Sequence, residues 1–239
     1  FAGIVARIPT ELSQLLFTFD ISQLPLYILF TAIGLLIVAG VVVITEAERP
    51  VPVTYAKQVR GDHISGGTQT YLPIRINQAG VIPIIFALSI LLFPQLIGNF
   101  LATSTNATLL SISHGLLWFV QNTWLYSLSY FIFVFLFTYF YTAVTFDPDQ
   151  LSSNLQKNGA FIPGIRPGQA TREYISKILT RTTTMGAVFL GLIAVLPLVI
   201  KSVTGITALS IGGTSLLIVV SVVLDLIKKT DAQLSMREY

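Results

Sequence analysis

Long uninterrupted stretches of apolar residues dominate the hydrophobic pattern of this chain. A helix needs about 20 apolar residues to cross the roughly 30 Å hydrocarbon core of a bilayer. Five uncharged runs of about that length therefore predict membrane-spanning helices. These runs cover residues 24–45, 79–102, 124–146, 183–200 and 206–224. Residues 1–8 form a shorter apolar run, which we interpret as the tail of a further span.

Two long polar segments separate these spans, and each contains several glycines and prolines: residues 46–76 and residues 147–182. Twelve of the 14 Lys and Arg residues lie in these two loops and in the carboxy-terminal tail. Two spans lie between one basic segment and the next, so all three are predicted on the same side of the membrane. The positive-inside rule makes that side cytoplasmic. Residues 103–123 carry no charge and are predicted to form an exported loop.

Composition supports an integral membrane protein of the all-α class, a polytopic helical bundle. The chain is 53% hydrophobic and only 10% charged, with a mean hydropathy of +0.76, far from soluble usage. Small residues allow helices to pack closely in membranes, and four glycines are predicted to serve this purpose. They are Gly186, Gly191, Gly212 and Gly213.

The residue inventory argues against several kinds of chemistry. There is no cysteine and there are two histidines, so disulfide frameworks and the usual zinc or thiol sites are not expected. No glycine-rich nucleotide-binding pattern occurs. We therefore predict no catalytic residue, no metal site and no cofactor.

No charged residue or histidine lies within the core of any predicted span. Such residues mark proton and ion pathways, so their absence weakens the interpretation as half of a secondary transporter. An intramembrane protease would need a nucleophile and base, or two aspartates, at depth, and no span provides them. A noncatalytic receptor or assembly factor remains open on composition alone.

The second span begins with a polar, bendable turn, because Asn77 and Gln78 precede Gly80. Pro83 and Pro94 interrupt this span and Pro197 interrupts the fourth, and each removes a backbone donor and favours a kink. We predict that a helix built in this way can move as a gate.

Four motifs resemble the SecY family of protein-translocation channel proteins, in family order and spacing. Residues 46–57 (EAERPVPVTYAK) resemble the exit from a span into a large cytoplasmic loop, and residues 76–83 (INQAGVIP) the entry into the next span. Residues 161–168 (FIPGIRPG) resemble the tip of the family's other large loop, and residues 212–218 (GGTSLLI) its last span. Over its whole length the chain is similar to the carboxy-terminal half of the family.

This resemblance implies a channel subunit of the general secretion translocon in the inner membrane of a bacterium. Such a subunit passes unfolded preproteins across the membrane and releases apolar segments laterally into lipid. The family has ten spans in two pseudo-symmetric halves, of which this chain resembles the second. The amino-terminal half, with the plug and one side of the lateral gate, would be a separate partner, and this chain alone is not expected to conduct.

The resemblance also implies roles for individual apolar residues. A narrow apolar ring dewets when it is empty and yields to a passing chain, and Ile4, Ile85 and Ile218 would form this constriction. Ile82 and Ser89 would lie at the lateral gate or beside the pore.

The basic loops imply partners that deliver or push the substrate. Family resemblance names the SecA motor ATPase and the ribosome, whose phosphates would attract basic loop tips. Arg166 matches the family's central loop arginine. At the tip of the first loop the family commonly has two basic residues, whereas this chain has Asp62 and His63, so Arg60 would supply the positive charge for docking there. Arg172 and Lys177 would contact a partner or anchor the chain to anionic lipid. SecE, SecG and preprotein signal sequences are the other implied partners.

Overall fold

A computed structural model describes residues 24–56, 58–60, 63–65 and 69–204, with isolated positions at residue 13 and between residues 222 and 234. Four helices in this part of the chain are long and apolar enough to cross a membrane. They are α3 (Leu24–Glu46), α4 (Ile82–Leu101), α6 (Thr123–Thr145) and α8 (Gln169–Thr204). Four of the five predicted spans are thus confirmed as long apolar helices. The fifth, residues 206–224, and the partial span 1–8 lie outside the described ranges.

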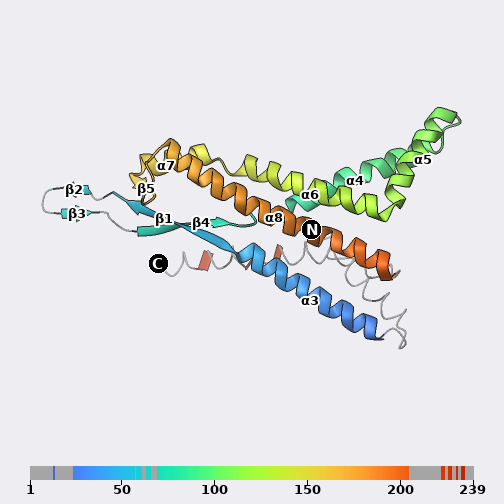
Figure 1. The fold of residues 1–239 in the computed structure, drawn as a ribbon, viewed down its shortest axis with the longest axis horizontal. Coiled ribbons are helices and arrows are strands. Elements are labelled where there is room, and N and C mark those ends of the chain that lie inside the picture. Colours follow the sequence, from blue (N-terminus) through green and yellow to red (C-terminus); the bar gives the residue numbers. More distant parts are fainter. Residues whose placement is uncertain are drawn as a thin grey trace.

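Helices α4, α6 and α8 form the central bundle, in which α6 and α8 run side by side (Figure 1). Their shared core is built from aliphatic side chains around one buried tyrosine. The buried members are Ile84, Ala87, Leu91, Tyr130, Val134, Leu190 and Ala194. Each helix contributes residues spaced three or four apart, which places them on one side of the helix.

Two of the four predicted packing glycines, both in α8, lie in close contact with other parts of the chain. A Cβ atom on Gly186 would lie 2.8 Å from the carbonyl oxygen of Ile76, and one on Gly191 would lie 2.7 Å from the ring of Phe131. At each of these two positions α8 therefore approaches its neighbour more closely than an alanine would permit. Gly212 and Gly213 lie outside the described ranges.

Helix α3 packs more loosely than the central bundle. Its Ile37 and Val41 are buried with Ile193 of α8, and a Cβ atom on Gly40 would lie 3.4 Å from the Phe189 ring. Most of its other leucines and isoleucines are exposed. Much of the α3 surface is therefore left to face lipid or another polypeptide.

The uncharged segment predicted as an exported loop contains a helix, α5 (Ala107–Gln121). Asn106 caps it, because its side chain accepts a hydrogen bond from the Thr108 backbone N–H. The buried Ser113 hydroxyl donates to the Gly98 carbonyl of α4 at 2.8 Å. At 15 residues, α5 is shorter than a span requires, so it adds no span to the predicted ones.

The polar loops fold into strands that the sequence analysis did not predict. Strands β1 (Glu48–Tyr55), β4 (Gln69–Arg75) and β5 (Ala160–Phe161) form an antiparallel sheet in the order β4-β1-β5. Strands β2 (Gln58–Arg60) and β3 (His63–Ser65) form a separate hairpin. The sheet packs against the first half of α8 through a second apolar core. Its buried members are Val51, Val53, Ile74, Ala160, Ile162, Ile175, Ile178 and Leu179.

Strand β1 tolerates two prolines because of its register. The Ile76 N–H donates to the Ala47 carbonyl at 3.0 Å, so odd-numbered residues of β1 bond toward β4. The Ala56 N–H donates to Gly159, so even-numbered residues face the other edge. Pro50 and Pro52 are even-numbered, and their missing N–H groups cost the β1–β4 ladder nothing.

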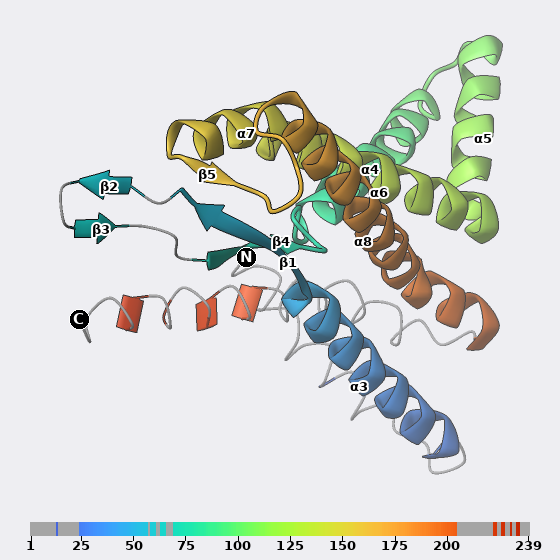
Figure 2. The ribbon, with the colours of Figure 1, turned by 60° about the vertical axis from the view of Figure 1, so that its left-hand side comes forward.

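Together with α7 (Pro148–Lys157), the sheet forms what we call the loop assembly. It lies at one end of the bundle, and α5 lies at the other (Figures 1 and 2). These two ends are called the loop end and the α5 end below.

Candidate functional site

One side of α4 brings three of the predicted site residues together. Ile82, Ile85 and Ser89 are spaced three and four residues apart, so they lie along the same side of the helix. Ile85 is 42% exposed and Ser89 is exposed as well. The opposite side of α4, with Ile84 and Leu91, is buried in the bundle core. The described helices therefore pack against the opposite side of α4 and leave the side with Ile85 and Ser89 exposed.

The Ser89 hydroxyl donates to the Ile85 carbonyl at 2.8 Å. Serines in membrane helices often satisfy themselves in this way. This bond satisfies the hydroxyl donor of Ser89, so the open side of α4 is predominantly apolar.

The turn before α4 holds the helix start in place. Gly80 adopts φ +61°, a conformation that favours glycine, and the buried Asn77 donates through Nδ2 to the Gly80 carbonyl at 3.3 Å. Pro83 lies in the first turn of α4, where no intrahelical bond is lost. The predicted kink at Pro83 is therefore wrong, whereas Pro94 and Pro197 do lie inside α4 and α8.

Arg166 lies at the tip of the second loop, on a backbone fixed from both sides. Gly164 and Gly168 adopt φ values of +82° and +99°, which only glycine accommodates readily. The Thr171 hydroxyl donates to the Arg166 carbonyl at 2.9 Å. Arg166 itself is exposed, so a rigid turn presents its charge to the surroundings.

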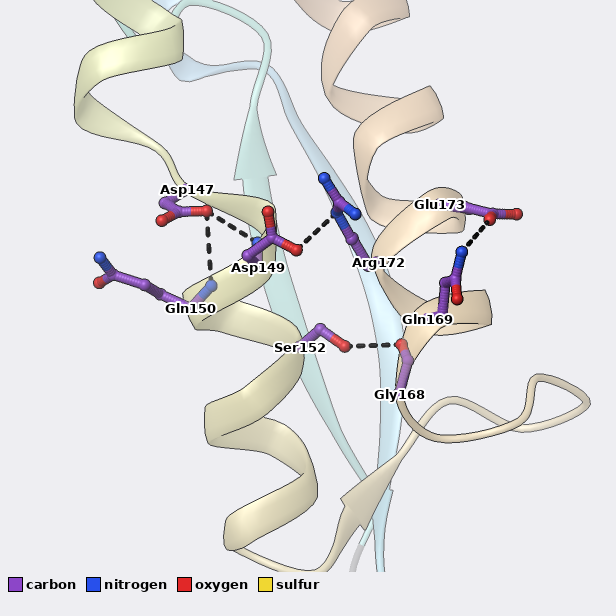
Figure 3. A network of polar contacts seen from close by, with 8 residues as sticks. All are labelled: Asp147, Asp149, Gln150, Ser152, Gly168, Gln169, Arg172 and Glu173. Carbon is purple, nitrogen blue, oxygen red and sulfur yellow. Dashed lines mark hydrogen bonds and ion pairs between the residues drawn. The ribbon is translucent and has the colours of Figure 1, made fainter.

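A polar network fastens α7 to the start of α8 (Figure 3). Asp147 caps α7 by accepting from the Asp149 backbone N–H at 2.8 Å, and the Ser152 hydroxyl donates to the Gly168 carbonyl at 2.8 Å. The Nε of Arg172 lies 2.5 Å from a carboxylate oxygen of Asp149. Arg172, predicted to contact a partner or lipid, is thus engaged within the loop assembly.

The remaining predicted residues are not brought to this network. Lys177 is exposed on α8, beyond the first turns of the helix. Arg60 belongs to β2, and its side chain is not described. Ile4 and Ile218 lie outside the described ranges.

Sequence reasoning missed the roles of Asp147, Asp149 and Ser152. The signal was present, because Asp147 is followed by Pro148 and Asp149, a pattern typical of a helix start. The described residues contain no group of three or more His, Asp or Glu side chains that could hold a metal ion.

Long apolar helices with a folded loop assembly at one end define a multi-pass membrane protein. Two solved structures share the fold, one titled as a protein-conducting channel (TM-score 0.50, 17% identical) and one describing the plug domain of SecY (TM-score 0.51, 16% identical). Each comparison covers 82% of this chain and 47% of the other.

The family follows from sequence. The SecY family profile matches residues 1–227. The protein translocase subunit SecY of Thermotoga maritima is 41% identical over 239 residues, covering 100% of this chain and 53% of that protein. That of Thermus thermophilus is 41% identical over 245 residues, covering 100% and 54%. The chain belongs to the SecY family, and it spans about half the length of the curated relatives it matches.

Proposed function

We propose that this chain is the carboxy-terminal half of the channel subunit of the general secretion translocon. In this role it passes unfolded preproteins across the membrane and releases apolar segments sideways into lipid. The open side of α4 carries the proposal, because it holds Ile82, Ile85 and Ser89 on a helix whose opposite side, with Ile84, Ala87 and Leu91, is buried in the bundle.

The pore requires a surface that seals against water without binding the substrate. The branched side chain of Ile85 suits that task because a narrow apolar constriction expels water when it is empty. By family resemblance Ile4 and Ile218 complete the ring. Ile82 and Ser89 border the lateral gate, where a signal sequence meets lipid, and the amino-terminal half supplies the opposite side.

The loop assembly serves as the docking surface for the energy source. We place it in the cytoplasm of a bacterium because of its basic residues. Arg166, exposed on a fixed turn, and Lys177 and Arg60 are the proposed contacts to the SecA motor ATPase and the ribosome. SecE and SecG complete the membrane assembly. The relatives are named as protein translocase subunits, one similar structure is titled as a protein-conducting channel, and the proposed role requires no catalysis by this chain.

Co-expression with a SecY amino-terminal half tests this function. An affinity tag on this chain is expected to recover that half together with SecE, and the assembly is expected to export a preprotein. Arg166→Glu should reduce export at least tenfold without loss of association, because reversal of the exposed charge leaves the backbone turn unchanged.

Lys157→Glu is the matched control, since Lys157 is also an exposed basic residue of the loop assembly. It should retain most of the export. If the two halves fail to associate, the assignment as a translocon half is wrong. If both charge reversals act equally, the specific role of Arg166 is wrong and the channel assignment stands.

A further inference from the structure

An apolar groove of about 540 Å³ lies between α6 and α8 at the α5 end of the bundle. Each helix contributes four side chains. The lining residues are Trp124, Ser127, Leu128 and Phe131 of α6 and Leu192, Val195, Leu196 and Val199 of α8. No charged side chain lines the groove, and one serine hydroxyl interrupts its aliphatic and aromatic walls.

That hydroxyl has no partner in the described part of the chain. Ser127 is 4% exposed, and its Oγ makes no hydrogen bond to the described residues. The buried threonines further along α6 behave differently, since Thr138 and Thr142 each donate to a backbone carbonyl one turn earlier. A buried hydroxyl without a partner is costly. The Oγ atom is covered in this structure, so an acceptor in the groove reaches it once the serine side chain changes rotamer, and the bond then formed would relieve this cost.

The groove is short enough to lie within one leaflet. Trp124 is 71% exposed at its mouth, and tryptophan favours the membrane–water interface. Ser127 lies three residues further along, about 4.5 Å deeper at 1.5 Å per residue. The lining stretches on each helix span about 10 Å by the same rise, a third of the roughly 30 Å hydrocarbon core. With Trp124 at the interface, this rise would place the hydroxyl just below the headgroups, at the level of the ester carbonyls of a phospholipid.

We propose that this groove binds a phospholipid of the leaflet at the α5 end. One acyl chain lies against Leu128, Phe131 and Val195, and an ester carbonyl accepts the Ser127 hydrogen bond. The uncharged lining predicts that headgroup charge does not affect binding.

Native mass spectrometry of the chain released from nanodiscs tests the proposal. Val195→Trp fills the groove and should remove one tightly retained phospholipid. Leu136→Trp is the matched control, because Leu136 is exposed on α6 outside the groove lining, and it should retain that lipid. Equal retention by both variants would overturn the proposal.

Ser127→Ala preserves the shape of the groove and isolates the hydrogen bond. It should weaken retention of ester-linked phospholipid roughly two- to tenfold, the effect of one hydrogen bond. Ether-linked lipid, which lacks the carbonyl, should bind both proteins equally. An unchanged ester-lipid affinity in this variant would show that Ser127 is not the donor.

The other occupant to exclude is the chain's own predicted last span, residues 206–224. Because the chain has no cysteine, Leu128→Cys can be paired with single cysteines placed along that span. Efficient disulfide formation would show that the span fills the groove, which would overturn the lipid site. Its absence at every position, together with loss of lipid in Val195→Trp, is the result expected here.

Discussion

At the scale of single residues, the approach of α8 to its neighbours depends on the absence of a side chain at two glycines. Gly186 faces a backbone carbonyl, which cannot move aside as the end of a side chain can. Gly191 faces the Phe131 ring, which has more room to adjust. The two contacts therefore differ in how much they resist a methyl group.

Gly186→Ala is expected to lower the free energy of unfolding by about 1–3 kcal/mol, the usual cost of overpacking. Gly115→Ala is the control, because a Cβ there meets nothing within 4 Å, and it should be neutral or slightly stabilising. Thermal unfolding in detergent, followed by circular dichroism, compares them. Equal stability of the two variants would contradict the close contact.

Ile85→Gly should make the assembled channel leak ions, because it removes the branched side chain proposed to seal the pore. Leu92→Gly is the control, since Leu92 is also exposed on α4 two turns away. Conductance across a planar bilayer measures both. A tight Ile85→Gly channel, or equal leaks, would remove Ile85 from the constriction.

At the scale of elements, α7 is held by a cap, one buried hydrogen bond and one exposed ion pair. Asp147 satisfies the first N–H groups of α7, and Ser152 is buried as it bonds to Gly168. The side chains of Arg172 and Asp149 are 52% and 58% exposed. Solvent screens such a pair, so the buried bond and the cap matter more for stability.

A double-mutant cycle on Asp149→Ala and Arg172→Ala should give a coupling energy below about 1 kcal/mol that falls with added salt. Ser152→Ala should cost about 1 kcal/mol with little salt dependence. Limited proteolysis between α7 and α8 reports local stability for all variants. A coupling energy well above that of the serine bond would show that the ion pair dominates.

At the scale of the whole molecule, the two ends of the bundle are predicted on opposite sides of the membrane. Gln169→Cys at the loop end and Thr105→Cys at the α5 end place single exposed thiols in a chain without cysteine. In intact cells a membrane-impermeant maleimide should label position 105 and spare position 169. Permeabilised cells provide the control, because both positions should then react. The reverse pattern would invert the orientation.

The described helices also leave large apolar surfaces open. Helix α3 is exposed along most of its length, and the Ile85 side of α4 faces no described helix. In a membrane these surfaces need not be covered by another polypeptide, because lipid tails are as apolar as the exposed side chains. Their extent agrees with a chain that spans about half of its relatives, and it supports the proposal that an amino-terminal half closes the pore.

The sequence by itself determined the four long apolar helices that the structure describes, because the length of an uncharged apolar run is fixed by the thickness of the bilayer. It also indicated Gly186 and Gly191 as packing positions and the family through its four motifs. Composition alone does not separate a channel from a receptor or assembly factor. Comparison with whole relatives was needed to decide between these alternatives.

Only the tertiary structure decided which residues meet across long separations in sequence. The β4-β1-β5 sheet joins two loops about 100 residues apart, and the prolines of β1 concealed it until the register showed that they face the edge away from β4. The pairing of Asp149 with Arg172 and the groove around Ser127 likewise arise from neighbouring helices. Periodicity describes one element at a time, and these features depend on how two elements pack.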